Sequence, residues 1–357
     1  PYLAKVVNFL NPDIWTIEEL GGTYPMDRAA LITSLQTFIN ANLTIFGPNP
    51  QPNVNYYLYV SAQSDGYTCP GIVSRYPLTE QTTYNDNLRG FVQSVATLPS
   101  GAKLGVFVTH LKATTSSANA PADSVKRQTE AEAGAANVTA FMSAHPGAGV
   151  VVTGDWNETE EPGETPNYPI GTVLTNGKTY RPITAMRSPG LSDSSALSIL
   201  AKKATISSTN PNARFDYICY ANASLVPDTL VFDAAQYSGT QLTAINTANG
   251  STLTSTDCKN ASDHLPVVAV LAVGGEAQNT AAAFKIKSLS VTPTGPQLTF
   301  HEGRGKIYRL ERTIDLSNAA SWTTVLDSIA GTGGDLTVTD PGAASLPTFF
   351  YRLRILP

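Results

Sequence analysis

The sequence predicts a mixed α/β sandwich followed by a small all-β sandwich. Up to about residue 272, apolar strand-like runs alternate irregularly with a few helical stretches, a pattern typical of a mixed sandwich and not of a regular parallel α/β fold. From residue 284 onward, short alternating runs are separated by turn residues such as Asp340-Pro341-Gly342, which favours a small β-sandwich. Residues 274–283 are small and polar, as in a linker. The predicted domains are therefore 1–273 and 284–357.

Three helices are expected in the first domain. Residues 1–11 place Pro1 in the first turn and end before Pro12, since the residue before a proline is disfavoured in a helix. Residues 26–40 form the second helix. The third, residues 123–144, ends at a His-Pro-Gly sequence.

The strands are predicted from apolar and β-branched runs. The segments 89–96 and 103–110 are expected to pair as antiparallel neighbours. The strand at 13–20 ends in two carboxylates. The predicted strands are 13–20, 55–62, 71–76, 89–96, 103–110, 149–155, 214–221, 225–232 and 264–272.

The composition is that of a globular protein with few charges. Of 357 residues, 42% are hydrophobic and only 14% charged, which favours an extracellular protein rich in strands and turns. No apolar run reaches the roughly 20 residues needed to cross a bilayer, and any signal peptide is expected to be already removed. Cys69, Cys219 and Cys258 allow at most one internal disulfide. No Cys-x-x-Cys pair is present, which disfavours structural zinc.

The charge is divided unevenly between the two domains. From Thr280 onward there are 8 Lys and Arg against 6 Asp and Glu, a net charge of +2; the preceding residues have 15 against 22, a net charge of −7. An acidic first domain does not hold polyanions by electrostatics alone, but it concentrates divalent cations.

The most informative stretch is 149–158, where a short buried strand ends at Gly154 and is followed by Asp155 and Asn157. Polar groups just past the carboxyl end of a central strand are where ligand chemistry collects in α/β proteins. An Asp and an Asn there can hold a water and a phosphoryl oxygen, one as base and the other as donor. The alternative is a turn in which the two side chains only cap the loop.

Five polar clusters, including this one, lie at the ends of predicted strands. A single His or carboxylate at such a position is usually structural, but five clusters together favour a common site. They supply oxygen ligands suited to Mg²⁺, Mn²⁺ or Ca²⁺ and two imidazoles that move protons near neutral pH. The clusters are Glu18 with Glu19, His110, Asp155 with Asn157, Asp216, and Asp263 with His264.

Six short motifs in order and spacing make the family resemblance definite. The chain resembles the endonuclease/exonuclease/phosphatase superfamily, the DNase I-like fold, over residues 1–272. That resemblance implies a four-layer α/β sandwich and metal-dependent cleavage of phosphoesters. The motifs are Pro12-Asp13-Ile14 with Glu19, Ser74-Arg75-Tyr76-Pro77, Thr109-His110-Leu111, Gly154-Asp155-Trp156-Asn157, Phe215-Asp216-Tyr217 and Ser262-Asp263-His264-Leu265-Pro266.

The resemblance implies metal and nucleophile roles for four positions. Glu19 resembles the family's metal-binding Glu, with Glu18 where Gln is more usual. Asp263 resembles a metal-site carboxylate. Asp155 and Asn157 resemble the pair that orients the nucleophile and contacts the phosphate.

The remaining positions carry acid–base and binding roles in the same way. His264 resembles the histidine that acts on the phosphate or the attacking water, and Asp216 the Asp that orients a catalytic histidine. His110 resembles the second histidine of the DNase I and sphingomyelinase branches, a candidate general acid. Arg89 is a candidate substrate-binding residue near the scissile phosphate or, alternatively, a solvated strand end. Arg127 is expected to anchor the long helix.

Two further expectations follow. The family opens with a strand bearing a metal- or phosphate-binding Asn, and the sequence begins after it, so we expect upstream residues to have been removed or supplied otherwise. The second domain, with Tyr308, Trp322, Phe350 and Tyr351 as its core, resembles fibronectin-like sandwiches of secreted bacterial proteins. It is expected to dock through a modest polar contact and to be dispensable for chemistry.

The leading functional hypothesis is a secreted bacterial phosphodiesterase that depends on Mg²⁺, Mn²⁺ or Ca²⁺, most simply a nuclease acting on nucleic acid. A sphingomyelinase or phospholipase C-type enzyme, a small-molecule phosphatase, and a catalytically lapsed surface or assembly protein are the alternatives. The second domain could contact a cell surface or polymer. Glycans at Asn157 or Asn260 would obstruct the site, so we expect an unglycosylated protein.

Overall fold

The computed structural model describes residues 1–22, 24–44, 56–85, 87–198, 200, 202–206, 213–274, 286–316, 318–346 and 348–356. The predicted linker lies outside these residues from position 275 on. No helix in the described ranges is both long and apolar enough to span a bilayer.

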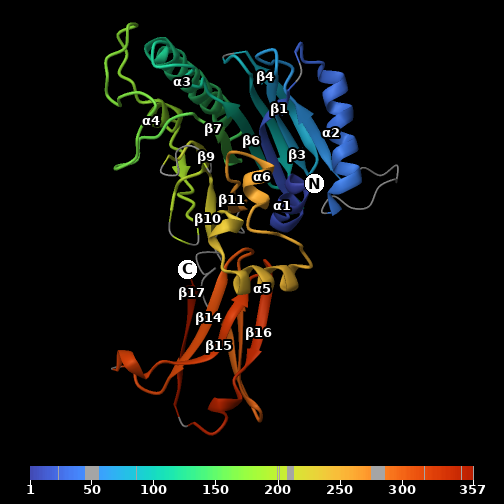
Figure 1. Ribbon diagram of the computed structural model, residues 1–357, viewed down its shortest axis with the longest axis vertical. Coiled ribbons are helices and arrows are strands. Elements are labelled where there is room, and N and C mark those ends of the chain that lie inside the picture. Colours follow the sequence, from blue (N-terminus) through green and yellow to red (C-terminus); the bar gives the residue numbers. More distant parts are fainter. Residues whose placement is uncertain are drawn as a thin grey trace.

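The first domain is a four-layer α/β sandwich, as expected (Figure 1). Its two inner layers are sheets, and its two outer layers are helices. α2 covers a three-stranded sheet of order β1-β3-β2, and α3 covers a six-stranded sheet of order β4-β5-β6-β7-β9-β8. The elements are β1 (Ile14–Gly21), α2 (Arg28–Asn42), β2 (Tyr57–Val60), β3 (Thr68–Ser74), β4 (Leu78–Tyr84), β5 (Phe91–Thr97), β6 (Lys103–His110), α3 (Ala120–Ala144), β7 (Gly149–Asp155), α4 (Pro182–Met186), β8 (Ser192–Asp193) and β9 (Asp216–Ala221).

Each interface between layers has its own apolar core. Phe107 of β6 and Val152 of β7 pack against Phe141 of α3. Val106, on the opposite face of β6, packs against Ile72 of the smaller sheet. A strand buried on both faces reads as a continuous apolar run, which is why β6 and β7 were predictable. The antiparallel pairing of β5 with β6 is also confirmed.

The connection through α3 sets the position of the polar strand ends. β6 and β7 are parallel, in register from Leu104 with Gly149 to His110 with Asp155. Two parallel strands require a long crossover, which α3 provides. β9 runs antiparallel to β7 and starts where β7 ends, so that Asp216 pairs with Asp155. Three of the predicted polar positions therefore meet at one edge of the sheet.

The rest of the first domain forms a smaller body beside the two sheets. β10 and β11 make a two-stranded antiparallel sheet, and α1 packs on α6. Among the described residues, β1 has a ladder partner only in β3, and β11 only in β10, so both strands present an open edge. α5, α6 and β4 were not predicted from the sequence. The elements are α1 (Tyr2–Leu10), β10 (Ala223–Val231), α5 (Gly239–Asn249), α6 (Asp257–Ala261) and β11 (Val267–Val273).

The second domain is an all-β sandwich, as predicted. Its two three-stranded antiparallel sheets have the orders β12-β13-β16 and β15-β14-β17. Tyr308 is fully buried in its core, but Phe350 is 37% exposed, and the guanidinium of Arg352 lies 4.2 Å from the ring centroid of the partly buried Trp322. The strands are β12 (Ile286–Thr292), β13 (Gly295–His301), β14 (Ile307–Thr313), β15 (Thr323–Ala330), β16 (Asp335–Thr339) and β17 (Phe350–Leu356).

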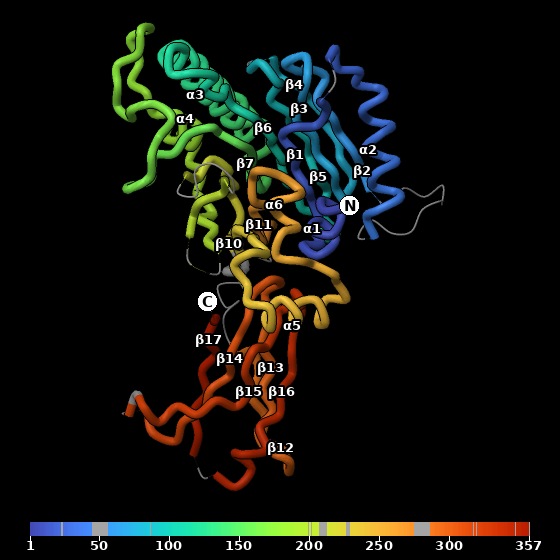
Figure 2. Tube along the Cα trace, in the orientation of Figure 1, coloured from blue at the N-terminus to red at the C-terminus, as the bar shows by residue number. Residues whose placement is uncertain are grey.

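The contact between the domains includes an apolar cluster beside its polar contacts. Ile307 of β14 is completely buried in the same apolar cluster as Leu230, Phe232 and Tyr237 of the first domain. The hydroxyl of Tyr237 also donates a hydrogen bond to the carbonyl of Gly305. In Figure 2 the second domain lies below the first, and α5 lies where the two domains meet. The docking surface lies far from the linker in sequence, so the polarity of the linker did not reveal it.

The three cysteines are free and buried. Cys69 lies beneath α2, Cys219 in the core beneath α3, and Cys258 in the cluster shared with the second domain. They therefore serve as small apolar core residues.

Candidate active site

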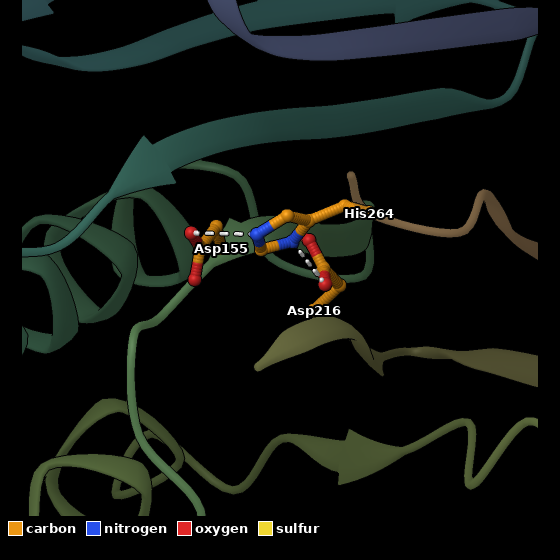
Figure 3. A group of neighbouring side chains, drawn as sticks. All are labelled: Asp155, Asp216 and His264. Atoms are coloured by element: carbon orange, nitrogen blue, oxygen red, sulfur yellow. Dashed lines mark hydrogen bonds and ion pairs between the residues drawn. The ribbon is translucent and has the colours of Figure 1, made fainter. Parts of the chain in front are cut away.

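Four predicted residues from separate segments converge on one point. His110 ends β6, Asp155 ends β7, Asp216 begins β9, and His264 precedes β11. Figure 3 shows Asp155, Asp216 and His264 pointing toward one another.

Asp155 stands between the two histidines. Its Oδ2 lies 3.3 Å from Nε2 of His110 and 4.0 Å from Nε2 of His264. The other ring nitrogen of His264, Nδ1, is hydrogen-bonded to Oδ2 of Asp216 at 2.8 Å. A histidine held by a carboxylate on one nitrogen has a fixed orientation and presents the other nitrogen to the site.

The backbone at Gly154 brings Asp155 into place. Gly154 has φ 146°, and a Cβ there would lie 1.8 Å from the carbonyl oxygen of Thr109. Glycine is therefore required for both its conformation and its close approach to β6. This approach keeps Asp155 next to His110.

Gly154→Ala is expected to lower the free energy of unfolding by about 3 kcal/mol or more, because a disfavoured φ is combined with a backbone clash. Urea unfolding measures this loss. Gly147→Ala is the matched control, since Gly147 also has a positive φ, 82°, but nothing lies within 4 Å of an added Cβ. Equal losses in the two variants would show that the contact with Thr109 is unimportant.

Asn157 orients Asp155. It has a left-handed φ of 51°, and its backbone N–H donates to Oδ1 of Asp155 at 2.7 Å. Its side-chain Nδ2 donates to the carbonyl of Leu111 at 3.0 Å and to Oδ2 of Asp155 at 3.1 Å. Both amide hydrogens are thus engaged inside the protein. This arrangement favours the orienting role over the predicted donation to a phosphate.

The electrostatics distinguish His264 from Asp155. Burial opposes a charge on His264, but its hydrogen bond to Asp216 and the charges of Asp216, Asp155 and Asp263 raise its pKa to about 10. Burial works against ionisation of Asp155 as well, yet the hydrogen bond from His110 and the charges of both histidines lower its pKa. At neutral pH His264 is therefore a cation and Asp155 an anion.

Glu18 and Glu19 both reach the site although they are consecutive. Oε1 of Glu19 lies 3.6 Å from Nδ1 of His110, a buried nitrogen with no hydrogen-bond partner among the described atoms. Glu18 is partly buried; burial and the nearby carboxylates of Asp216 and Asp155 raise its pKa well above the usual value. Adjacent residues of a regular strand face opposite sides, but the pairing of β1 shifts register between Ile17 and Leu20.

The donor set at the site fits a divalent cation. One potential ligand atom from each of Asp155, Asp216 and His264 lies within 4.8 Å of the others. Glu19 and Asp263, the predicted metal residues, are outside this group: the Glu19 side chain is 61% exposed beside His110, and Asp263 lies exposed in the loop before β11. Since His264 is protonated and already bonded to Asp216, the carboxylates are the ligands that fit a hard cation.

The two arginines named from the sequence, Arg89 and Arg127, form ion pairs within the protein. Nε of Arg89 donates to Oδ2 of Asp65 at 2.7 Å, and its side chain is 19% exposed. Arg89 is therefore an ion-paired loop residue and not a solvated strand end. Arg127 is fully buried and forms an ion pair with Glu158. Glu158 was not predicted from the sequence as a structural residue, because the burial of a glutamate depends on tertiary packing.

The fold and site define a phosphoesterase-like α/β sandwich, and the comparison with family models agrees. Residues 2–264 match the model described as the Endonuclease/Exonuclease/phosphatase family. The chain belongs to this family. No curated protein sequence matches it significantly.

Solved structures with a similar fold have low sequence identity. An endonuclease/exonuclease/phosphatase from Beutenbergia cavernae is 15% identical, with 99% of this chain and 93% of that chain covered and a TM-score of 0.47. Truncated Caenorhabditis elegans TDP2 is 16% identical, with coverages of 76% and 90% and a TM-score of 0.42. Sphingomyelinase C from Streptomyces griseocarneus is 17% identical, with coverages of 64% and 81% and a TM-score of 0.39. The family assignment rests on the family model.

Proposed function

We propose that the protein is a divalent-metal-dependent phosphodiesterase, and that nucleic acid is its substrate. The observation that carries the proposal is the position of Asp155 between His110 and His264, with His264 held by Asp216. A general base, a cationic donor and a second imidazole within one site are the groups that hydrolysis of a phosphodiester needs.

The charges assign the roles. Asp155 is ionised and oriented by Asn157, so it serves as the base for the attacking water. His264 is protonated, so it donates to a phosphoryl oxygen and offsets the charge that develops there. The buried His110 contacts Asp155 through Nε2 and is the candidate acid for the leaving oxygen.

Asp155, Asp216 and the nearby Glu19 would hold the cation, for which Mg²⁺ is proposed first and Mn²⁺ or Ca²⁺ next. When bound, such an ion supplies Lewis-acid stabilisation of the phosphoryl group. The net charge of −7 before Thr280 agrees with attraction of a cation. The same negative charge makes tight electrostatic binding of long nucleic acids a weak expectation.

Secretion from a bacterium and contact of the second domain with a cell surface or polymer complete the proposal. The composition supports secretion: few charges and many Gly, Ser, Thr and Asn residues. Sphingomyelin and small phosphomonoesters remain the alternative substrates.

Hydrolysis assays test the function directly. The purified protein is incubated with plasmid DNA, RNA, sphingomyelin, bis-p-nitrophenyl phosphate and p-nitrophenyl phosphate, with Mg²⁺, Mn²⁺ or Ca²⁺ and with EDTA. We expect release of product from a phosphodiester with a divalent cation, and none in EDTA. If only sphingomyelin or only the monoester is cleaved, the proposed nucleic-acid substrate is wrong and the cleaved compound gives the substrate class. A folded protein that hydrolyses none of the five would be a scaffold and not an enzyme.

A further inference from the structure

We propose that Arg127 and Glu158 are a buried positioning pair that fixes the segment carrying His110 against the segment carrying Asp155 and Asn157. The inference rests on the proposed function for its kinetic consequences, but its structural part is independent of any activity. Neither side chain contacts the reacting groups; both act through the main chain around them.

Glu158 is the anchor of the loop that follows β7. It is completely buried, and each carboxylate oxygen accepts several hydrogen bonds. Oε1 accepts from the backbone N–H groups of Thr159 at 3.0 Å and Asn167 at 2.6 Å. Oε2 accepts from the N–H of Tyr168 at 3.2 Å, the hydroxyl of Tyr180 at 2.6 Å and Nη1 of Arg127 at 3.0 Å.

Glu158 thereby determines the place of its neighbour Asn157. The segment that Glu158 holds includes Asn167, whose Nδ2 donates to the carbonyl of Asn157 at 2.8 Å. The carbonyl of Glu158 itself accepts a hydrogen bond from the hydroxyl of Tyr217 at 3.2 Å. The strained φ of Asn157 is thus held from both directions, which is the condition for such a conformation to persist.

Arg127 performs the corresponding task for the segment after His110. Its Nε donates to the carbonyl of Lys112 at 2.7 Å, and its Nη2 donates to Oγ1 of Thr114 at 2.8 Å. Glu130, one turn later on α3, accepts from the N–H of the same Lys112 at 2.7 Å. Residues three apart on a helix share a face, so α3 holds both main-chain groups of the residue two positions after His110.

The pair therefore joins two segments that also meet at Leu111. There, Leu111 donates its N–H to the carbonyl of Asp155 at 3.0 Å and accepts from Nδ2 of Asn157 at 3.0 Å. A single guanidinium bonded to Lys112, Thr114 and Glu158 sets the separation of the two segments. Arginine suits this task because its planar fork directs several donors at fixed angles, which the ammonium of lysine does not do.

Three substitutions test the pair. Arg127→Lys and Glu158→Gln keep most of the side-chain volume, but the first removes the guanidinium fork and the second replaces one acceptor oxygen with an NH₂ donor. Tyr180→Phe removes the hydroxyl that donates to Glu158 and accepts from Arg127, without leaving an unpaired buried charge. Arg312→Lys is the matched control: Arg312 pairs with the buried Asp340 in the second domain, far from the site in sequence.

Two measurements are made on each variant. One is steady-state turnover of the phosphodiester that the wild type hydrolyses. The other is the set of imidazole NMR resonances of histidine-labelled protein. The chain has four histidines, so His145 and His301, which lie outside the site, serve as internal references for His110 and His264.

We expect Arg127→Lys and Glu158→Gln to lower kcat about 10- to 100-fold with KM changed less than about threefold, the effect of a small misplacement of catalytic groups. The resonances of His110 and His264 should move, while His145 and His301 stay. Arg312→Lys should change neither quantity.

Folded variants with unmoved His110 and His264 resonances and wild-type kcat would overturn the proposal. If Arg127→Lys and Glu158→Gln do not fold, Tyr180→Phe decides it by the same two measurements. If the wild type hydrolyses nothing, the proposed function fails, but the histidine resonances still accept or reject the positioning role.

Discussion

Replacing His264 with alanine is expected to lower turnover about 10²–10⁴-fold, the usual contribution of a positioned acid or base. His264 has a pKa raised to about 10 and is oriented by the carboxylate of Asp216. Its loss removes the donor to the phosphoryl oxygen and leaves Asp216 close to Asp155 without a compensating charge. KM should change much less than kcat, because the charge develops in the transition state.

His145→Ala is the matched control for this experiment. The side chains of His145 and His264 are both 28% exposed, and each contacts a carboxylate, Glu80 in the case of His145 at 3.0 Å. His145→Ala therefore removes an imidazole of equal exposure that lies outside the site, and its turnover should stay at the wild-type level. Turnover by His264→Ala within a few-fold of wild type, in a protein that melts normally, would make His264 a structural residue.

The strands that carry the site could be predicted because they are buried on both faces. The runs that became β6 and β7 are apolar throughout and end in His110 and Asp155. Pairing of His110 with Asp155 then follows from two parallel strands joined by one long helix. The proximity of His110 and Asp155 was accessible from the sequence for this reason.

Side-chain directions could not be predicted in the same way. Alternation along β1 would place only one of Glu18 and Glu19 toward the site, and the register shift that brings both there leaves no mark in the sequence. The two amide hydrogens of Asn157 bond to Asp155 and to the carbonyl of Leu111, and Leu111 lies 46 residues away in sequence. Charged residues such as Glu158 are usually exposed, so its complete burial depends on a partner from a distant helix.

The second domain illustrates the same limit at a larger scale. Its sandwich could be predicted from turn spacing, and its separate core is present around Leu298 and Tyr308. The docking surface is built from Phe232, Tyr237 and Ile307, which lie on either side of the linker at a distance in sequence. Composition of the linker carries no information about such a surface.

A chain ending at Gly274 is consequently expected to melt at least about 5 °C below the full-length protein or to aggregate. Truncation exposes Leu230, Phe232 and Tyr237, which are at most 6% exposed with the second domain in place. Covering a large apolar side chain stabilises by about 1.5–3 kcal/mol, and about 1 kcal/mol corresponds to roughly 2–4 °C in a domain of this size.

Calorimetry and light scattering on the truncated and full-length proteins measure the change in melting temperature and in aggregation. In the full-length chain, Ile307→Ala is compared with the control Leu289→Ala. Ile307 is fully buried in the shared cluster, whereas Leu289 of the same domain is 50% exposed, so only Ile307→Ala should lower the first transition. Turnover per folded molecule should survive truncation, because every proposed catalytic residue precedes Gly274. A truncated protein that is soluble and melts like the full-length chain would show that the apolar contact contributes nothing to stability.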